Sequence, residues 1–177
     1  MDVFEAIRKR REITHFSEKQ IAASDLEKIL DSAFFSPTGN NLPSREFILV
    51  KEKEKLTYLS HSTPFVSWLA KAQAAIVVTG CPDISKYWLQ DASIACAFIW
   101  LSATELEIGV GFGAVYNNAN PEEAEKREEY VRKALDIPED RRIVAILGLG
   151  YPEKWPPSKK MHLREDIVHY ERFGVSK

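Results

Sequence analysis

Hydrophobic residues are densest in the middle of the chain, where Trp88–Ile108 is predicted to form one long helix. Between Asp91 and Glu105 lie thirteen residues without a charge, and their apolar side chains fall on every face of a helix rather than on one stripe. That run is shorter than the roughly twenty apolar residues that a membrane span needs. We therefore expect a buried helix that is covered by its own chain, by a second subunit, or by both.

Three shorter apolar runs predict strands, and all three are expected to be buried. They are Glu46–Val50, Gln73–Gly80 and Arg142–Gly150. A fourth segment, Gly109–Val115, has glycine at three alternate positions, which permits close approach of another backbone. The spacing of these glycines does not match the GxGxxG fingerprint of dinucleotide-binding proteins.

Capping residues and helical spacing predict the helices around these strands. Asp2 and Ser24 each begin a capping box, and Asn120 caps a helix that continues to Leu135. Pro37 disfavours helical geometry in the residue before it, so the helix that starts near Ser24 should stop at that point. Two short helices are predicted at Glu52–Ser60 and Pro64–Lys71, and the first helix is expected to bury Val3, Phe4 and Ile7.

No repeat, linker or low-complexity tract divides the sequence, so we expect one domain over residues 1–177. Strands and helices do not alternate regularly, which favours a layered α+β fold over a doubly wound one. Residues 152–177 are rich in proline, lysine and aromatic side chains, and only Glu165–Tyr170 suggests a helix. We expect this segment to form a C-terminal arm without a core of its own, able to pack on a partner subunit.

Composition argues against several classes of function. The chain is 45% hydrophobic and 28% charged with a net charge of −2, so neither nucleic acid nor an anionic membrane is an expected partner. Cys81 and Cys96 do not make a disulfide framework and lie in apolar contexts typical of buried thiols. No signal peptide is recognisable, and we expect a cytoplasmic location. The histidines are scattered, so we interpret none as a metal ligand.

Two polar segments are candidates for ligand binding. The run Arg8–Arg11 is either a solvated turn at the negative end of a helix dipole or an anion site, since guanidinium groups grip phosphates through paired hydrogen bonds. The loop Pro37–Ser44 is either an ordinary connection or a set of hydrogen-bonding groups for a flat polar ligand. Four aromatic residues belong either to the core or to the wall of a substrate pocket: Phe65, Trp68, Trp88 and Trp100.

Eight motifs follow one another along the chain. They are Arg10-Arg11, Phe16, Ser36-Pro37-Thr38-Gly39-Asn40-Asn41, Phe47–Val50, Gln90-Asp91-Ala92, Gly109-Val110-Gly111, Leu135–Pro138 and Gly148–Pro152. In this order they resemble the FMN-dependent nitroreductase family over nearly the whole chain. The resemblance implies a three-layer α+β fold with a mixed, mostly antiparallel sheet flanked by helices and a long buried central helix. It also implies an intertwined homodimer with FMN bound at the interface.

The resemblance assigns candidate residues to the cofactor. The expected phosphate and ribityl contacts are Arg10, Arg11 and Thr14, together with Lys160 from the C-terminal arm. The loop that meets the isoalloxazine ring, usually from the other subunit, corresponds to Pro37, Thr38, Gly39 and Asn41. The amides near the pyrimidine edge of the ring correspond to Gly113, Ala114 and Val115. Because its amide is expected to touch the ring, Asn41 is the candidate catalytic residue.

The chain departs from the family pattern at several of these positions. Glu12 stands where serine is usual, so its carboxylate must turn away from a phosphate or pair with a cation. Thr14 replaces an arginine or lysine and can donate one hydrogen bond but no charge. The usual Gln-Pro-Trp after the asparagine is Pro43-Ser44-Arg45 here.

The resemblance implies an oxidoreductase that carries two electrons from NADH or NADPH through FMN. The acceptor is expected to be a nitroaromatic, a quinone or a similar electron-poor small molecule, reduced by ping-pong kinetics. The departures leave two alternatives open. One is a flavin-binding module with little turnover, and the other is an offshoot that acts on reduced FMN or runs a reductive dehalogenation.

Overall fold

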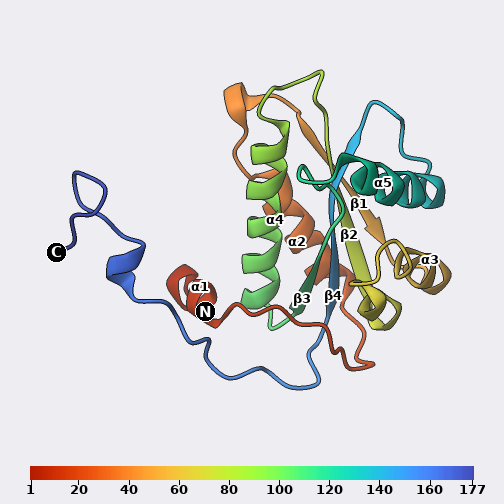
Figure 1. Cartoon of the computed structure of the whole chain (residues 1–177). Helices are drawn as coiled ribbons and strands as arrows, with labels where there is room; N and C mark the ends of the chain where they lie inside the picture. The colour runs from red at the N-terminus through yellow and green to blue at the C-terminus, as the bar shows by residue number, and fades with distance from the viewer.

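The computed structural model describes residues 1–177. The protein consists of a four-stranded sheet between two layers of helices (Figure 1). The strand order is β1-β2-β4-β3, and all three pairings are antiparallel. The only parallel pairing is an isolated bridge between Glu12 and Val110. The expected three-layer α+β fold is confirmed. The strands are β1 (Arg45–Val50), β2 (Ala74–Gly80), β3 (Gly109–Ala114) and β4 (Arg142–Gly150).

Five α-helices and three short 3₁₀ helices accompany the sheet. The α-helices are α1 (Val3–Lys9), α2 (Ala23–Phe34), α3 (Lys53–Leu59), α4 (Trp88–Glu105) and α5 (Pro121–Leu135). The 3₁₀ helices are η1 (Gly39–Asn41), η2 (Ser67–Lys71) and η3 (Arg164–Asp166). In Figure 1, α2 and α4 cover one face of the sheet, and α3 and α5 cover the other. No helix has the length and apolar character needed to cross a membrane.

Two of the three predicted helix caps are confirmed. The Asp2 carboxylate accepts from the Glu5 N–H at 2.8 Å, and the Asn120 side chain accepts from the Glu123 N–H at 3.1 Å. The capping box at Ser24 is wrong, because the N-cap of α2 is Ala22, two residues earlier, and the first turn closes on the Ala22 carbonyl. At its other end α2 stops at Phe34, slightly before the predicted position.

Successive side chains of the central strands point to opposite faces of the sheet, so they contribute to the core on both sides. Ile76 and Val78 pack toward α2 and α4, whereas Ala75 and Val77 pack toward α3 and α5. Every residue of β2 is buried, as the apolar run predicts. The prediction of a buried strand is wrong for β1, whose residues are mostly half-buried because it lies at the edge of the sheet.

Only one side of α4 is covered within the chain. The buried side includes Ala95, Cys96 and Ile99. On the opposite side, an apolar stripe at helical spacing stays partly exposed: Ile94, Ala97, Phe98 and Leu101. The expectation that α1 buries Val3, Phe4 and Ile7 is also wrong for the single chain, since these side chains are at least half exposed and only Ala6 is buried. We call this combined surface of α1 and α4 the apolar face.

The chain after β4 leaves the layers and runs past α1 (Figure 1). Of the helix suggested at Glu165–Tyr170, the structure contains only η3. Met161, Leu163, Ile167 and Phe173 are mostly exposed, the last at 93%. This segment therefore has no core of its own, as its composition predicts.

Both cysteines are free and buried, as the sequence predicts. Burial raises the pKa of the Cys81 thiol to about 11 and that of Cys96 to about 12. Because the thiolate is the reactive species, Ellman's reagent at about pH 8 should label neither thiol in the folded protein and both after unfolding in guanidinium chloride. Labelling of either thiol before unfolding would contradict its burial.

Candidate functional site

Arg10 and Arg11 adjoin at the end of α1 but have different surroundings. The Arg11 guanidinium donates to the carbonyls of Arg8 and Arg10 at 2.8 and 2.7 Å, and also to the Pro157 carbonyl at 3.2 Å. It therefore closes the end of α1 and attaches the C-terminal arm. Arg10 makes no hydrogen bond or ion pair through its side chain, and its guanidinium lies 4.7 Å from the ring centroid of Trp100. Of the two, Arg10 has its donors free for an anion.

Trp100 positions this part of the chain. Its ring stacks on Phe112 at a centroid distance of 5.7 Å, and its indole N–H donates to the Arg11 carbonyl at 3.1 Å. A single α4 side chain thus supports the Arg10 guanidinium and fixes the Arg11 backbone. From the sequence, Trp100 was expected either in the core or in the wall of a substrate pocket. No pattern in the sequence indicated that it contacts Arg10.

The outer edge of β3 presents backbone groups beside this cluster. Ile13 donates to the Val110 carbonyl at 3.0 Å, and the Val115 N–H donates inward to the Val144 carbonyl at 3.1 Å. Because inward and outward groups alternate along an antiparallel edge strand, the N–H groups of Phe112 and Ala114 point outward. Of the three predicted amides, that of Ala114 therefore faces the open edge, and those of Gly113 and Val115 face β4.

Glu12 lies at the same edge. Its carboxylate accepts weakly from the Phe112 N–H at 3.4 Å and forms no ion pair. The Thr14 side chain forms a hydrogen bond only with its neighbour, with 3.3 Å between its hydroxyl and His15 Nδ1. Lys160 is exposed in the arm, which passes near α1 where Lys9 lies 5.3 Å above the Trp155 ring. The nearby cavity of about 390 Å³ is lined by Arg8, Lys9 and Arg11 together with Trp155.

The loop Pro37–Ser44 lies at the other end of α4. Its residues Pro37, Thr38 and Asn41 line a cavity of about 440 Å³ together with Phe34, Phe35 and Phe47. Asn41 is exposed, and Gly39 belongs to the short helix η1. The Gly39 N–H donates to the buried Asp91 carboxylate at 2.9 Å. Asn41 therefore faces open space, whereas the Gly39 N–H points inward to Asp91.

The predicted site residues form two separate groups within the chain. The loop is held at Asp91 and the arginine cluster at Trp100, nine residues further along α4. That spacing corresponds to about 14 Å and two and a half helical turns, so the two side chains leave α4 on opposite sides. The cavities beside the two groups share no residue.

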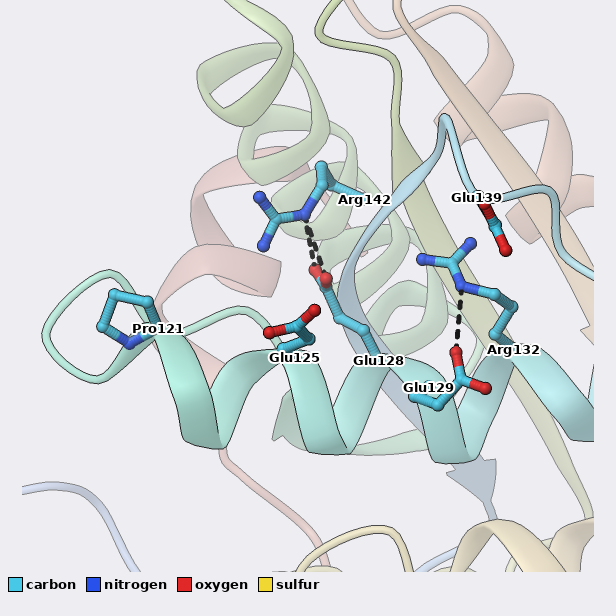
Figure 2. A pocket seen from close by; sticks show the side chains of 7 residues that line it. All are labelled: Pro121, Glu125, Glu128, Glu129, Arg132, Glu139 and Arg142. Atoms are coloured by element: carbon cyan, nitrogen blue, oxygen red, sulfur yellow. Dashed lines mark hydrogen bonds and ion pairs between the residues drawn. The ribbon is translucent and has the colours of Figure 1, made fainter.

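A larger cavity of about 570 Å³ lies elsewhere, between α5 and the start of β4 (Figure 2). It contains none of the predicted site residues. The acids of this cavity include Glu128, which is buried and accepts from Arg142 Nε, and Glu129, which pairs with Arg132. No group of three or more metal-binding side chains occurs anywhere in the structure.

Comparison with protein families identifies the relationship. The model of the nitroreductase family matches residues 7–64 and 60–151, which together make up most of the chain. The chain belongs to the nitroreductase family. A relative from Archaeoglobus fulgidus, provisionally named NADH dehydrogenase/NAD(P)H nitroreductase, is 36% identical over 170 residues, with 93% of this chain and 94% of the relative aligned.

Solved structures of other nitroreductases share the fold. An FMN-dependent nitroreductase from Clostridium difficile R20291 is 29% identical, with a TM-score of 0.86 over 96% of this chain and 99% of that protein. A provisionally named NADH dehydrogenase/NAD(P)H nitroreductase from Bacteroides thetaiotaomicron is 26% identical, with a TM-score of 0.88 over 97% of this chain and 98% of that protein.

Proposed function

We propose that this member of the nitroreductase family is an FMN-dependent oxidoreductase that transfers two electrons from NADH or NADPH to an electron-poor small molecule. The observation that carries the proposal is the unpaired Arg10 guanidinium on the face of Trp100, beside the outward edge of β3. A free cation fits a phosphate, and free amides fit the polar edge of a flavin ring. The family and the FMN-dependent relative support the same assignment.

We further propose that two copies of the chain complete each site. The arginine group and the loop Pro37–Ser44 attach to opposite sides of α4, so one chain does not bring them together around one ligand. The apolar face, with Phe4 69% and Phe98 39% exposed, is the surface that a second copy would cover. In a symmetric dimer, the loop of each copy can then reach the arginine group of its partner.

In this arrangement FMN supplies the redox chemistry when bound, since it accepts a hydride and passes two electrons onward. Arg10 would hold the phosphate, and the Ala114 N–H would donate to the polar edge of the ring. The same outward amides would stabilise negative charge that develops on that edge. Asn41 would hydrogen-bond to the ring from the partner's loop, and the covering of the apolar face would exclude water.

Anaerobic stopped-flow measurements on FMN-loaded protein test the proposal. We expect NADH or NADPH to bleach the flavin absorbance, and an added quinone or nitroaromatic compound to restore it without the nucleotide present. That order of events is the signature of ping-pong transfer. A protein that does not retain FMN would refute the proposal.

Glu12 favours a second candidate, a flavin-binding protein with little turnover. Its carboxylate sits at the β3 edge without a cation to neutralise it, where it would oppose negative charge on the ring. The same stopped-flow experiment separates the two functions. Protein that is yellow but is bleached by neither nucleotide would support this second candidate.

Asn41→Ala should retain flavin and slow its reduction, because the Asn41 amide is expected to meet the ring rather than the phosphate. We expect the rate of flavin bleaching to fall about tenfold, which corresponds to the loss of one hydrogen bond of about 1.4 kcal/mol. Asn40→Ala is the matched control, since Asn40 is also exposed and also has a positive φ. Equal bleaching rates in Asn41→Ala and the parent protein would remove Asn41 from the site.

A further inference from the structure

We propose that Asp91 is a positioning residue for the loop Pro37–Ser44, holding the loop in the conformation that it offers to the flavin. The inference rests on the proposed function, because it assigns the loop a role at FMN. Asp91 stands in the first turn of α4 and belongs to the Gln90-Asp91-Ala92 motif, to which the sequence assigned no role. It does not itself line the cavity beside the loop.

Asp91 holds the loop at two points, one at the first residue of η1 and one three residues after its end. One carboxylate oxygen accepts from the Gly39 N–H at 2.9 Å, and the other accepts from the Ser44 hydroxyl at 2.5 Å. Asp91 is only 3% exposed and Ser44 is fully buried. Hydrogen bonds to a buried carboxylate are among the strongest that a protein makes. Both ends of the segment that carries Asn41 are therefore fixed to the same side chain.

The segment between these two points needs such support. Asn40 and Asn41 both have a φ of 55°, in the left-handed region that residues other than glycine adopt at a cost. Two successive residues in this conformation persist only where the surroundings impose it. The backbone hydrogen bonds within the turn are long, at 3.2 Å from Asn41 to Thr38 and from Leu42 to Gly39. The contacts with Asp91 are shorter and come from outside the turn.

Gly39 shows how closely the loop approaches α4. A Cβ atom at this position would lie 2.8 Å from Cδ2 of Tyr87, so any side chain here would force the Tyr87 ring to move. The backbone of Ser44 is also held in place, because its carbonyl accepts from the Cys81 N–H at 2.8 Å. The loop is thus pressed against the beginning of α4 and the end of β2.

The neighbouring charges explain why a carboxylate can be buried here. The N-terminal end of α4 carries a partial positive charge that favours an acid in its first turn. Arg45 follows the loop, and its guanidinium donates to the Phe34 carbonyl at 3.1 Å and to the Ser36 hydroxyl at 3.0 Å. Burial lowers the pKa of Arg45, and the charge of Asp91 acts in the opposite direction. The negative charge of Asp91 therefore also favours the charged form of Arg45, whose guanidinium binds the carbonyl of Phe34 at the end of α2.

Two substitutions separate the hydrogen bonds of Asp91 from its charge. Asp91→Ala removes both acceptors. Asp91→Asn removes the charge but keeps both contacts, because its amide oxygen can accept from the Gly39 N–H and its amide nitrogen can donate to the Ser44 hydroxyl oxygen. The matched control is Glu128→Ala, which removes another buried acid, bonded to Arg142 and to the Ile143 N–H and outside the loop.

Amide hydrogen exchange across residues 38–44 of the flavin-free protein measures directly how often the loop opens. For Asp91→Ala we expect exchange there to be at least about tenfold faster, FMN affinity to fall about tenfold, and the visible circular dichroism of bound FMN to decrease. Asp91→Asn should restore all three readouts to near the parent values. Glu128→Ala should lower the melting temperature without changing loop exchange or the flavin signal.

Two results would overturn the inference, and a third would refute the function on which it rests. Unchanged loop exchange in Asp91→Ala would show that the loop does not depend on Asp91. Faster exchange with unchanged FMN affinity and dichroism would show that the loop's conformation does not matter to the flavin, and the proposed function would stand. Failure of the parent protein to bind FMN would instead refute the proposed function itself.

Discussion

Arg10→Ala should lower the affinity for FMN by about 10- to 100-fold and leave the fold intact. A charged hydrogen bond contributes about 1.5–3 kcal/mol, which corresponds to that range of affinity. The Arg10 side chain makes no hydrogen bond within the chain and only lies over Trp100, so its removal costs little internal structure. Titration of the flavin-free protein with FMN, followed by flavin fluorescence, measures the change.

Arg8→Ala is the matched control for this experiment. Arg8 carries the same charge two residues earlier, in the last turn of α1, but it lines the cavity beside Trp155 instead of lying on Trp100. Its removal should change FMN affinity by less than about threefold, since exposed charges act weakly through screened solvent. Equal losses in both variants would mean that general positive charge, rather than Arg10, retains the cofactor.

Phe98→Arg should raise the dimer dissociation constant by about a thousandfold and release FMN as a consequence. Phe98 belongs to the apolar face and is 39% exposed on α4. Covering the exposed part of Phe98 contributes about 1 kcal/mol, an unpaired arginine buried in its place costs at least about 1 kcal/mol more, and symmetry doubles every substitution at a twofold interface. The sum of about 4 kcal/mol is a factor of about a thousand in affinity. Light scattering coupled to gel filtration gives the oligomeric state.

The control for Phe98→Arg is an equivalent change on the opposite layer. Tyr58 in α3 is 41% exposed and stacks on Tyr130. We expect Tyr58→Arg to remain dimeric and yellow, because this side of the sheet is already covered by α3 and α5. A monomeric parent protein, or a Phe98→Arg variant that stays dimeric at low concentration, would contradict the proposed interface.

The elements that could be predicted from sequence are those whose signals are local. Arg142–Gly150 is a continuous apolar run, and Asn120 followed by Pro121 marks a helix start, so both were placed correctly. Ser24 has the same signature as Asp2, yet only the latter caps its helix. The sequence does not record which carbonyl closes the first turn, and at α2 that carbonyl belongs to Ala22.

Burial and site chemistry were harder to predict, because they depend on what lies opposite each side chain. Val3, Phe4 and Phe98 are apolar at helical spacing, a pattern that is the same whether the partner is another helix or a second chain. Arg10 and Arg11 are adjacent residues of the same type, so the sequence does not distinguish their roles. Only the structure shows that Arg11 donates to the last carbonyls of α1 and that Arg10 does not. Asp91 was part of a motif, but its bond to Gly39 crosses 52 positions of the chain.

The bridge between Glu12 and Val110 also bears on how the protein behaves at high concentration. An uncovered outer strand is a template on which a foreign strand can grow, which leads to aggregation. Glu12 and Ile13 occupy part of that edge of β3, and the Glu12 carboxylate adds a charge that repels further strands. The segment that leads from the arginines to the sheet therefore also protects this edge of β3 from pairing with another chain.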